Sequence, residues 1–259
     1  MIDAIVLAGA LNDSQLAICD DVKYEALINI NDKPILSYVL DALRKYKGIR
    51  TIMLVCPKEV MDKISPMPQL VFIESGDTLL ESLKNGLAQL DSNRLTLVAT
   101  GDIPLLTSEA IDDLLKQAKT RDADIYYPVV KKETCEREFP GVKRTYLTLL
   151  EGALTGGNVA LIKPSAIFAL KNLLDKAVIT RKKPWKMVGV LGLKLIFKFI
   201  IKSLSIPDIE NRLKILTGVQ AMAIVSDYAE IAFDVDKPED FELVQEILRC
   251  QITPVLPIT

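Results

Sequence analysis

Short runs of consecutive apolar residues alternate along the chain with segments whose apolar residues recur at helical spacing. Runs of about four to eight apolar residues are typical of strands that are buried on both faces of a parallel sheet. These runs predict strands at residues 4–8, 51–55, 70–73, 95–99, 125–130, 159–162 and 220–225. The helical spacing predicts helices at residues 35–43, 78–90, 108–118 and 238–248, and a further helix after residue 162.

The segment 78–90 has the clearest helical pattern, because its leucines share one face and Thr78 and Glu81 have the spacing of a capping box. Residues 131–143 are charged, which predicts a loop or a small hairpin. The alternation of strands and helices predicts an α/β fold: a three-layer, Rossmann-like, mostly parallel sheet with an elaborated helical C-terminal half. No internal repeat or low-complexity linker divides the chain, so a single domain is expected over residues 1–259.

Composition narrows the chemistry that the protein can perform. The 259 residues include 32 Lys and Arg against 34 Asp and Glu, and this net charge of −2 does not indicate a nucleic-acid-binding protein. Histidine is absent, which excludes Ser-His-Asp hydrolases, Cys-His proteases and histidine-ligated zinc enzymes. Any catalysis therefore has to use carboxylates, lysines, hydroxyls, backbone dipoles or a bound metal.

The cysteines and the start of the chain indicate a compartment. No two of the four cysteines form a CxxC pair, and such scattering is typical of reduced thiols in the cytoplasm. Asp3 and a short apolar run favour a buried first strand over a signal peptide. The four cysteines are Cys19, Cys56, Cys135 and Cys250. Together these features predict a cytoplasmic protein.

Two motifs follow predicted strands, at the carboxyl ends where open parallel sheets bind ligands. Residues 7–10 (LAGA) are small enough to let backbone N–H groups approach a nucleotide, although an ordinary strand-ending turn has the same composition. In residues 100–107 (TGDIPLLT), Asp102 is placed to hold a hard cation such as Mg²⁺ against phosphate oxygens. The alternative is that Asp102 only caps a turn.

A third motif, at residues 233–240 (FDVDKPED), supplies further carboxylates near the end of the chain. Alternate residues of an extended segment face the same side, so Asp234 and Asp236 point together, and at least one of them can complete a metal site. Glu239 and Asp240 fall in the first turn of the last helix, where they suit the helix dipole, and a structural role is expected for both.

The segments AIVLAGA, KPILSYVLDAL, GDTLLESLKNGL, TGDIPLLT, TGGN and DVDKPEDF together resemble the MobA-like nucleotidyltransferases of the glycosyltransferase-A-type superfamily. That group includes molybdenum-cofactor guanylyltransferases, cytidylyltransferases and sugar-1-phosphate uridylyltransferases. The resemblance implies a Rossmann-like sheet with one reversed strand. It also implies Mg²⁺-dependent transfer of a nucleoside monophosphate from an NTP to a phosphorylated acceptor, with release of pyrophosphate. The attacking phosphate oxygen is already ionised, so this chemistry needs no histidine.

The same resemblance assigns roles to individual residues. Mg²⁺ or Mn²⁺ would be held by Asp102 together with Asp236 as first choice and Asp234 as second, and Lys23 and Lys33 would assist catalysis beside Asp102. The second substrate would face Gly156, Gly157 and Asn158. The NTP would lie over Leu7, Ala8, Gly9, Ala10, Gly76, Asp77, Ser82, Asn85 and Gly101.

The phosphate loop departs from the family pattern. Ala10 stands where the family has a second glycine, Glu25 stands in what looks like a lysine position, and residues 11–22 contain three aspartates and no arginine. An acidic loop repels a triphosphate unless lysine or a second metal offsets the charge. These departures favour an alternative function, a catalytically weak nucleotide-binding or scaffolding protein that is attached to a membrane or a partner.

Two further enzyme classes are disfavoured. A glycosyltransferase that uses a nucleotide sugar usually carries Asp-x-Asp where this chain has TGDIP. A nicotinamide-linked dehydrogenase would need a GxGxxG motif after the first strand, and that motif is missing.

A basic hydrophobic segment, residues 184–204 (PWKMVGVLGLKLIFKFIIKSL), belongs to a helical insertion expected at about residues 183–217. On one continuous helix, Lys194, Lys198 and Lys202 would share a narrow arc and apolar residues would cover most of the rest. The lysines interrupt the run too often for a transmembrane span, but an interfacial helix at the inner face of a membrane fits the pattern. The alternative is a helix that is covered by the protein itself or by a homodimer partner.

Overall fold

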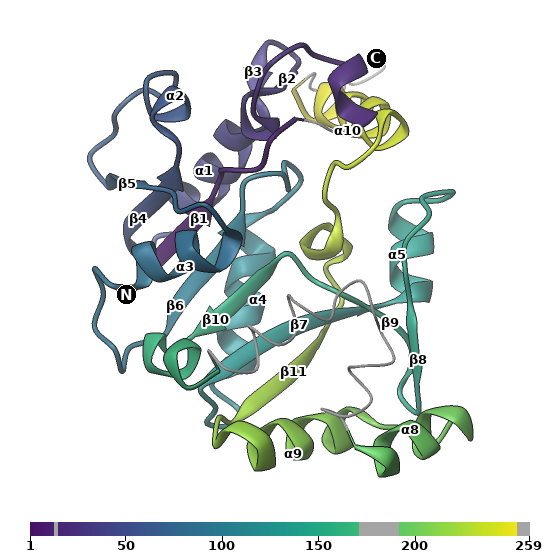
Figure 1. Cartoon of the computed structure of the whole chain (residues 1–259). Coiled ribbons are helices and arrows are strands. Elements are labelled where there is room, and N and C mark those ends of the chain that lie inside the picture. The colour runs from purple at the N-terminus through teal and green to yellow at the C-terminus, as the bar shows by residue number, and fades with distance from the viewer. Residues whose placement is uncertain (13–14, 171–191, 253–259) are drawn as a thin grey trace, which may run out of the picture.

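The computed structural model describes residues 1–12, 15–170 and 192–252, and its centre is a nine-stranded sheet (Figure 1). The strand order is β5-β4-β1-β6-β10-β7-β9-β8, with β11 also paired to β7. The strands are β1 (Ile2–Leu7), β4 (Ile49–Cys56), β5 (Leu70–Glu74), β6 (Thr96–Thr100), β7 (Ile125–Lys131), β8 (Leu147–Leu149), β9 (Gly152–Gly156), β10 (Val159–Ile162) and β11 (Ala221–Ser226). A separate two-stranded ribbon joins β2 (Asn29–Ile30) to β3 (Lys33–Pro34).

The predicted mostly parallel sheet is confirmed. Strands β1, β4, β5 and β6 pair in parallel, as do β7 and β11. Strand β10 is the reversed strand, antiparallel to both β6 and β7. The β8–β9 hairpin adds a further antiparallel pairing at the β7 edge.

Helices cover both faces of this sheet, which gives the predicted three layers. Successive side chains of β1 point to opposite faces, so Val6 packs in the cluster that includes α1 and α4, and Ile5 packs in the cluster that includes α3. The helices are α1 (Ile35–Lys45), α2 (Lys58–Met61), α3 (Leu79–Leu87), α4 (Ser108–Ala118), α5 (Lys132–Glu138), α8 (Leu193–Ile200), α9 (Ile206–Thr217) and α10 (Pro238–Ile252). Short 3₁₀ turns form η1 (Gln15–Ile18), η2 (Glu25–Leu27) and η3 (Ala229–Ala232), and residues 164–170 are also helical.

The predicted start of α3 is confirmed in detail. The Thr78 hydroxyl accepts a hydrogen bond from the Glu81 backbone N–H at 3.1 Å, and the Glu81 carboxylate accepts one from the Asp77 N–H at 3.0 Å. The first bond satisfies an N–H group that the first helical turn leaves without a partner, and the second holds the residue before the N-cap against the helix.

The prediction of a loop or hairpin at residues 131–143 is wrong, because α5 occupies most of this range. Its sequence, KETCERE, is too polar to show helical periodicity. The helix is stabilised by one small buried face, where Cys135 packs against Val130, Ala229 and Ala232. The hairpin lies further along the chain, in β8 and β9.

The expected single helix over residues 184–204 is only partly present. Residues 184–191 lie outside the described part of the chain, and α8 ends at Ile200. Lys202 has a φ of +55°, so it does not continue the arc of Lys194 and Lys198. A capping box at Ser205 then starts α9, so residues 193–217 form two helices. Within the described residues, none of the helices is long and apolar enough to cross a bilayer.

Candidate functional site

The end of β6 and the segment before α10 are fastened together, and this contact creates the site. The N–H of Gly101 donates to the Leu7 carbonyl at 2.9 Å, which holds the turn after β6 against the end of β1. A Cβ on residue 101 would lie 3.1 Å from the Cβ of Ala8, so glycine permits this close approach. The Val235 N–H donates to the Asp102 carbonyl at 3.0 Å, which brings the DVD sequence to the same edge.

Three carboxylates converge at this edge, as the sequence predicts. Asp102, Asp234 and Asp236 each offer one oxygen, and these oxygens lie within 4.8 Å of one another. Oδ1 of Asp102 is buried and has no hydrogen-bond partner among the described residues. A buried carboxylate oxygen is costly without a partner, and a cation would supply one. This orphaned oxygen favours a metal ligand over a turn cap, and an all-carboxylate site suits a hard cation such as Mg²⁺.

Electrostatics within the cluster also indicate a missing positive charge. Burial raises the pKa of Asp102, and this effect outweighs the lowering by the neighbouring Thr100 hydroxyl and by Arg144, while the negative charge of Asp234 adds to it. Partial desolvation, with the charges of Asp234 and Asp102, raises the pKa of Asp236 to about 6. A divalent cation among these oxygens would oppose both effects.

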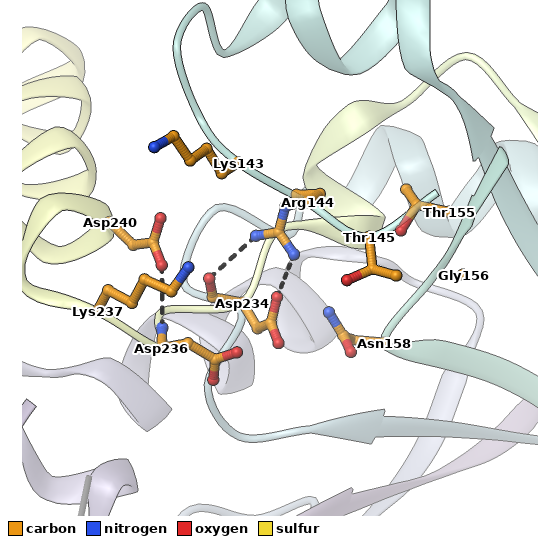
Figure 2. Close-up of a pocket in the computed structure, with 10 residues that line it drawn as sticks. All are labelled: Lys143, Arg144, Thr145, Thr155, Gly156, Asn158, Asp234, Asp236, Lys237 and Asp240. Atoms are coloured by element: carbon orange, nitrogen blue, oxygen red, sulfur yellow. Dashed lines mark hydrogen bonds and ion pairs between the residues drawn. The ribbon is translucent and has the colours of Figure 1, made fainter. Parts of the chain in front are cut away.

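Arg144, in the segment between α5 and β8, supplies positive charge from the protein itself. Its guanidinium forms an ion pair with the Asp234 carboxylate, donates to the Asp234 backbone carbonyl at 3.1 Å, and stacks 4.7 Å from the Phe233 ring centroid. Figure 2 shows both polar contacts. Asp234 is therefore already engaged, whereas Figure 2 draws no contact between Arg144 and the carboxylate of Asp236.

A cavity of about 280 Å³ opens beside the carboxylates (Figure 2). A second cavity of about 540 Å³ adjoins it and shares Lys143, Lys237 and Asp240 as lining residues. The first cavity is lined by Lys143, Arg144, Thr145, Thr155, Gly156, Asn158, Asp234, Asp236, Lys237 and Asp240. Three cationic side chains beside acidic metal-ligand candidates are a combination that can bind phosphate groups together with a divalent ion.

Asp240 also orients the cluster, because its carboxylate accepts a hydrogen bond from the Asp236 backbone N–H at 3.3 Å. Burial raises the pKa of Asp240. This contact agrees with the structural role that the sequence indicates for the residue, since the bond fixes the backbone that carries Asp236.

The TGGN segment is divided between cavity and packing. Gly156 and Asn158 line the first cavity. Gly157 instead lies against the protein interior, where an added Cβ would be 2.6 Å from the side chain of Ile231. The Asn158 backbone joins β6 to η3. Its carbonyl accepts a hydrogen bond from the Thr100 N–H at 3.1 Å, and its N–H donates to the Ile231 carbonyl at 2.8 Å.

The residues expected around the nucleotide lie at the end of β1, in the turn after β6, and in the loop before α3 and within that helix. The Ala8 N–H donates to Val55 at 2.9 Å, and Gly9 and Ala10 are exposed. A Cβ on Gly9 would lie 3.6 Å from Ser75, which places the end of β1 beside the loop before α3. Two hydrogen bonds hold that loop. The Gly76 N–H donates to the Ser82 hydroxyl at 3.1 Å, and the Asn85 side-chain amide donates to the Glu74 carbonyl at 3.1 Å.

The structure does not bring Lys23 and Lys33 into the two cavities beside the carboxylates. Lys23 is exposed and pairs with Glu59 at 2.6 Å. Lys33 pairs with Asp41, lies 4.2 Å from the Tyr38 ring centroid, and lines a separate cavity of about 440 Å³.

Sequence reasoning missed Lys143 and Arg144 as site residues. They follow a charged segment without apolar periodicity, and the partner of Arg144 is 90 residues away along the chain. Lys237 was also missed, although it lies inside the DVDKPED motif. The only sequence signal for Lys237 is its position between Asp236 and the start of the predicted helix at Pro238.

The fold and the site define the class of the protein. An open, mostly parallel α/β sheet binds its ligands at the carboxyl ends of its strands, where this structure gathers acidic residues with cations beside them. A family model for the MobA-like NTP transferase domain matches residues 23–184. The chain belongs to this family of nucleotidyltransferases.

Individual relatives agree with this family. A hypothetical transferase from Thermus thermophilus has a TM-score of 0.78 and 32% identity, over 93% of this chain and 100% of its own. A probable molybdenum cofactor guanylyltransferase from Thermococcus gammatolerans is 27% identical over 52% of this chain and 69% of its own length. A 2-C-methyl-D-erythritol 4-phosphate cytidylyltransferase from Clostridium botulinum is 27% identical over 46% of this chain, and the match spans 54% of that protein.

Proposed function

We propose that the protein is a Mg²⁺-dependent nucleotidyltransferase that moves a nucleoside monophosphate from an NTP to a phosphorylated acceptor and releases pyrophosphate. The observation that carries this proposal is the convergence of Asp102, Asp234 and Asp236, with a buried oxygen on Asp102 that has no hydrogen-bond partner in the described part of the chain. The family supports transfer of a nucleotide, and two of the three relatives above carry a nucleotidyltransferase name.

Asp102 and Asp236 are the proposed ligands of Mg²⁺ or Mn²⁺, and Asp234 is the second choice because Arg144 already engages it. The ion would supply charge stabilisation at the phosphate oxygens. Arg144, Lys143 and Lys237 line the same cavity and would bind the remaining phosphate charge.

The proposed reaction is an in-line displacement. An ionised oxygen of the acceptor phosphate forms a bond to the α-phosphorus, and the bond from that phosphorus to the bridging oxygen of pyrophosphate breaks. The electron pair leaves with pyrophosphate, so the step needs no proton transfer and no histidine. The task of the protein is to align the two substrates and to hold their charges.

The NTP would lie along the exposed edge formed by Gly9, Ala10 and the loop before α3, as expected from the sequence. The acceptor would then enter from the second cavity, since Lys143 and Lys237 connect it to the carboxylates. Val142 and Leu243 on its wall give it an apolar side, so an acceptor with a phosphate and a partly apolar body fits best. Catalytic roles for Lys23 and Lys33 stay predictions, since both would first have to leave their present acidic partners.

A catalytically weak nucleotide-binding or scaffolding protein is the second candidate. The observation in its favour is the phosphate loop, where Glu25 and the aspartates of residues 11–22 replace the expected cations. Both candidates are proposed to act in the cytoplasm, because Cys19, Cys56, Cys135 and Cys250 are all free thiols. For both candidate functions, we expect the exposed surface of α8 to be covered by a membrane or by a second copy of the chain.

Pyrophosphate release separates the two candidates. The intact chain is incubated with Mg²⁺, each of the four NTPs in turn and a panel of phosphorylated acceptors, and pyrophosphate is measured. We expect release with one NTP and acceptor, and loss of release in Asp102→Asn. A thermal shift with an NTP and Mg²⁺ but no turnover with any acceptor would favour the binding protein. No shift with any nucleotide would contradict both.

A further inference from the structure

Among the residues that the structure describes, helix α8 packs against the protein through one side. Leu195 is buried in a small cluster with Leu149, Leu154 and Leu204. Lys198 pairs with Asp208 of α9 at 2.6 Å, which fixes the angle between the two helices. These contacts place α8 on the protein surface next to α9 and the β8–β9 hairpin (Figure 1).

The turn after α8 is equally well held. The Ser203 N–H donates to the Lys198 carbonyl at 2.7 Å, and the Leu150 N–H donates to the Leu204 carbonyl at 2.8 Å. The Ile206 N–H donates to the Glu151 carboxylate at 3.0 Å. The outward side chains of α8 are thus presented by an anchored helix.

The other side of α8 is apolar and exposed. Phe197 is 62% exposed, Ile200 70% and Ile201 53%, and Phe199 is 47% exposed at the edge. We call these four residues the α8 patch. Leu150, 64% exposed, lies at the tip of the hairpin that holds Leu204. Single exposed apolar residues are common, but five large ones on neighbouring segments mark a surface that is covered in use.

Charge around the α8 patch distinguishes among the surfaces that could cover it. Residues 192–204 contain three lysines and no acidic residue. Lys198 is neutralised by Asp208, whereas Lys194 and Lys202 are exposed at the two ends of the patch. An apolar stripe flanked by lysines on flexible stems matches the interface of an anionic bilayer, where the apolar side chains enter and the lysines reach headgroups.

We propose that the α8 patch docks the protein onto an anionic lipid surface. A second copy of the chain fits less well, because a two-fold contact through this short helix would bring Lys194 and Lys202 close to the same lysines of the partner. A lipid surface instead provides negative charge and an apolar layer together. The docking does not depend on the chemistry at Asp102, so the proposal stands or fails separately from the proposed function.

Vesicle co-sedimentation of the intact chain tests the proposal. The probes are phosphatidylcholine vesicles with and without phosphatidylserine. We expect pelleting with the anionic vesicles and at least about tenfold weaker binding to the neutral ones, because two uncompensated lysines lose their attraction. The double variant Phe197→Ser/Ile200→Ser should lose roughly tenfold or more in binding to anionic vesicles, since less apolar surface enters the bilayer. Lys194→Glu/Lys202→Glu should lose the preference for phosphatidylserine.

A matched control removes exposed apolar side chains elsewhere, in Val71→Ser/Phe168→Ser, which should pellet like the unchanged chain. Sedimentation velocity without lipid and circular dichroism report assembly and folding for every variant. Equal pelleting of the unchanged chain and the Phe197/Ile200 variant would overturn the proposal, as would no pelleting at all. A dimer that becomes monomeric in the Phe197/Ile200 variant would assign the patch to a second copy instead.

Discussion

The guanidinium of Arg144 donates to both the carboxylate and the backbone carbonyl of Asp234, 90 residues further along the chain. Both side chains are largely buried, with 15% and 21% of their surfaces exposed. The ion pair fastens the segment between α5 and β8 to the DVD sequence and places one positive charge beside three carboxylates. It offsets part of the negative charge of the acidic cluster before any cation binds.

Arg144→Gln should lower the stability of the metal-free protein and increase the response to metal. The substitution removes the ion pair and the contact with the Phe233 ring. Loss of one partner of a largely buried pair costs about 2–4 kcal/mol in the free energy of unfolding. Because the carboxylates then lack a cation, Mg²⁺ should raise the melting temperature of the variant more than that of the unchanged protein.

The control for this prediction is Arg137→Gln, since Arg137 pairs with Glu138 at the surface. An exposed pair of this kind contributes at most about 1 kcal/mol. Urea denaturation with and without Mg²⁺ measures both effects. Equal stability and an equal Mg²⁺ response in the two variants would show that Arg144 does not balance the acidic cluster.

Asp102→Asn and Asp236→Asn should abolish the Mg²⁺-dependent thermal shift and reduce pyrophosphate release by roughly a thousandfold. Asp234→Asn should have a smaller effect, because Arg144 already engages that carboxylate. In metal-free protein Asp102→Asn should raise the melting temperature, since burial disfavours the charged carboxylate that it replaces.

Asp112→Asn is a matched control for the three substitutions, because Asp112 pairs only with Lys116 on the surface of α4 among the ion pairs of the described residues. Differential scanning fluorimetry and a pyrophosphate assay provide the two readouts. An undiminished Mg²⁺ shift in both Asp102→Asn and Asp236→Asn would remove the proposed metal site.

The metal-free protein should lose stability as the pH rises from about 4 to about 6. The ordinary pKa of Asp236 is 3.8, and in the folded protein desolvation and the two neighbouring carboxylates raise it to about 6. Between these values the folded state binds more protons than the unfolded state, so the free energy of unfolding falls with rising pH. Asp236→Asn lacks this titration, and its melting temperature should decline less across the range.

Mg²⁺ affinity should depend on pH in the opposite direction. Binding requires ionised carboxylates, so the affinity of the unchanged protein should fall as the pH drops below about 6. Isothermal titration calorimetry with Mg²⁺ measures this change in affinity. The titrations are done at pH 5 and pH 7, which lie below and above the pKa of Asp236. The same affinity at both values would contradict the participation of Asp236.

The central sheet and the acidic cluster could be predicted because each rests on a local signal. Strands β1, β4 and β6 each contain a short run of apolar residues, which is typical of strands buried on both faces of a parallel sheet. Asp102 lies two residues beyond the end of β6, and Asp236 lies two residues before a helix that begins with proline. Parallel topology brings the ends of such elements to one edge, so the meeting of the two residues follows from element type alone.

Arg144 and α5 could not be predicted, because neither has a local signal. The α5 sequence is almost entirely polar, and its helix depends on packing of Cys135 against η3, which lies far away in the sequence. Arg144 acquires its role only when the segment after α5 meets Asp234. Pairings of this kind depend on tertiary contacts that hydrophobic periodicity does not encode.

Gly156→Ala should impair the site through Tyr127 and leave the fold intact. An added Cβ at residue 156 would overlap the Tyr127 hydroxyl, so the phenol ring would have to move. Burial raises the pKa of Tyr127, and the charge of Asp234 adds to this effect. Because Gly156 lines the same cavity, the displaced ring should enter the space proposed for phosphate and lower pyrophosphate release by roughly tenfold.

The double variant Gly156→Ala/Tyr127→Val separates this steric effect from other consequences of the substitution. Valine is short, favours strands and removes the ring that the new methyl group would meet. Activity should therefore recover toward the level of Tyr127→Val alone, and the coupling between the two sites is read from the four rates. If Gly156→Ala reduces activity equally with and without the tyrosine ring, displacement of Tyr127 is not the cause, and the backbone of β9 itself contacts the substrate.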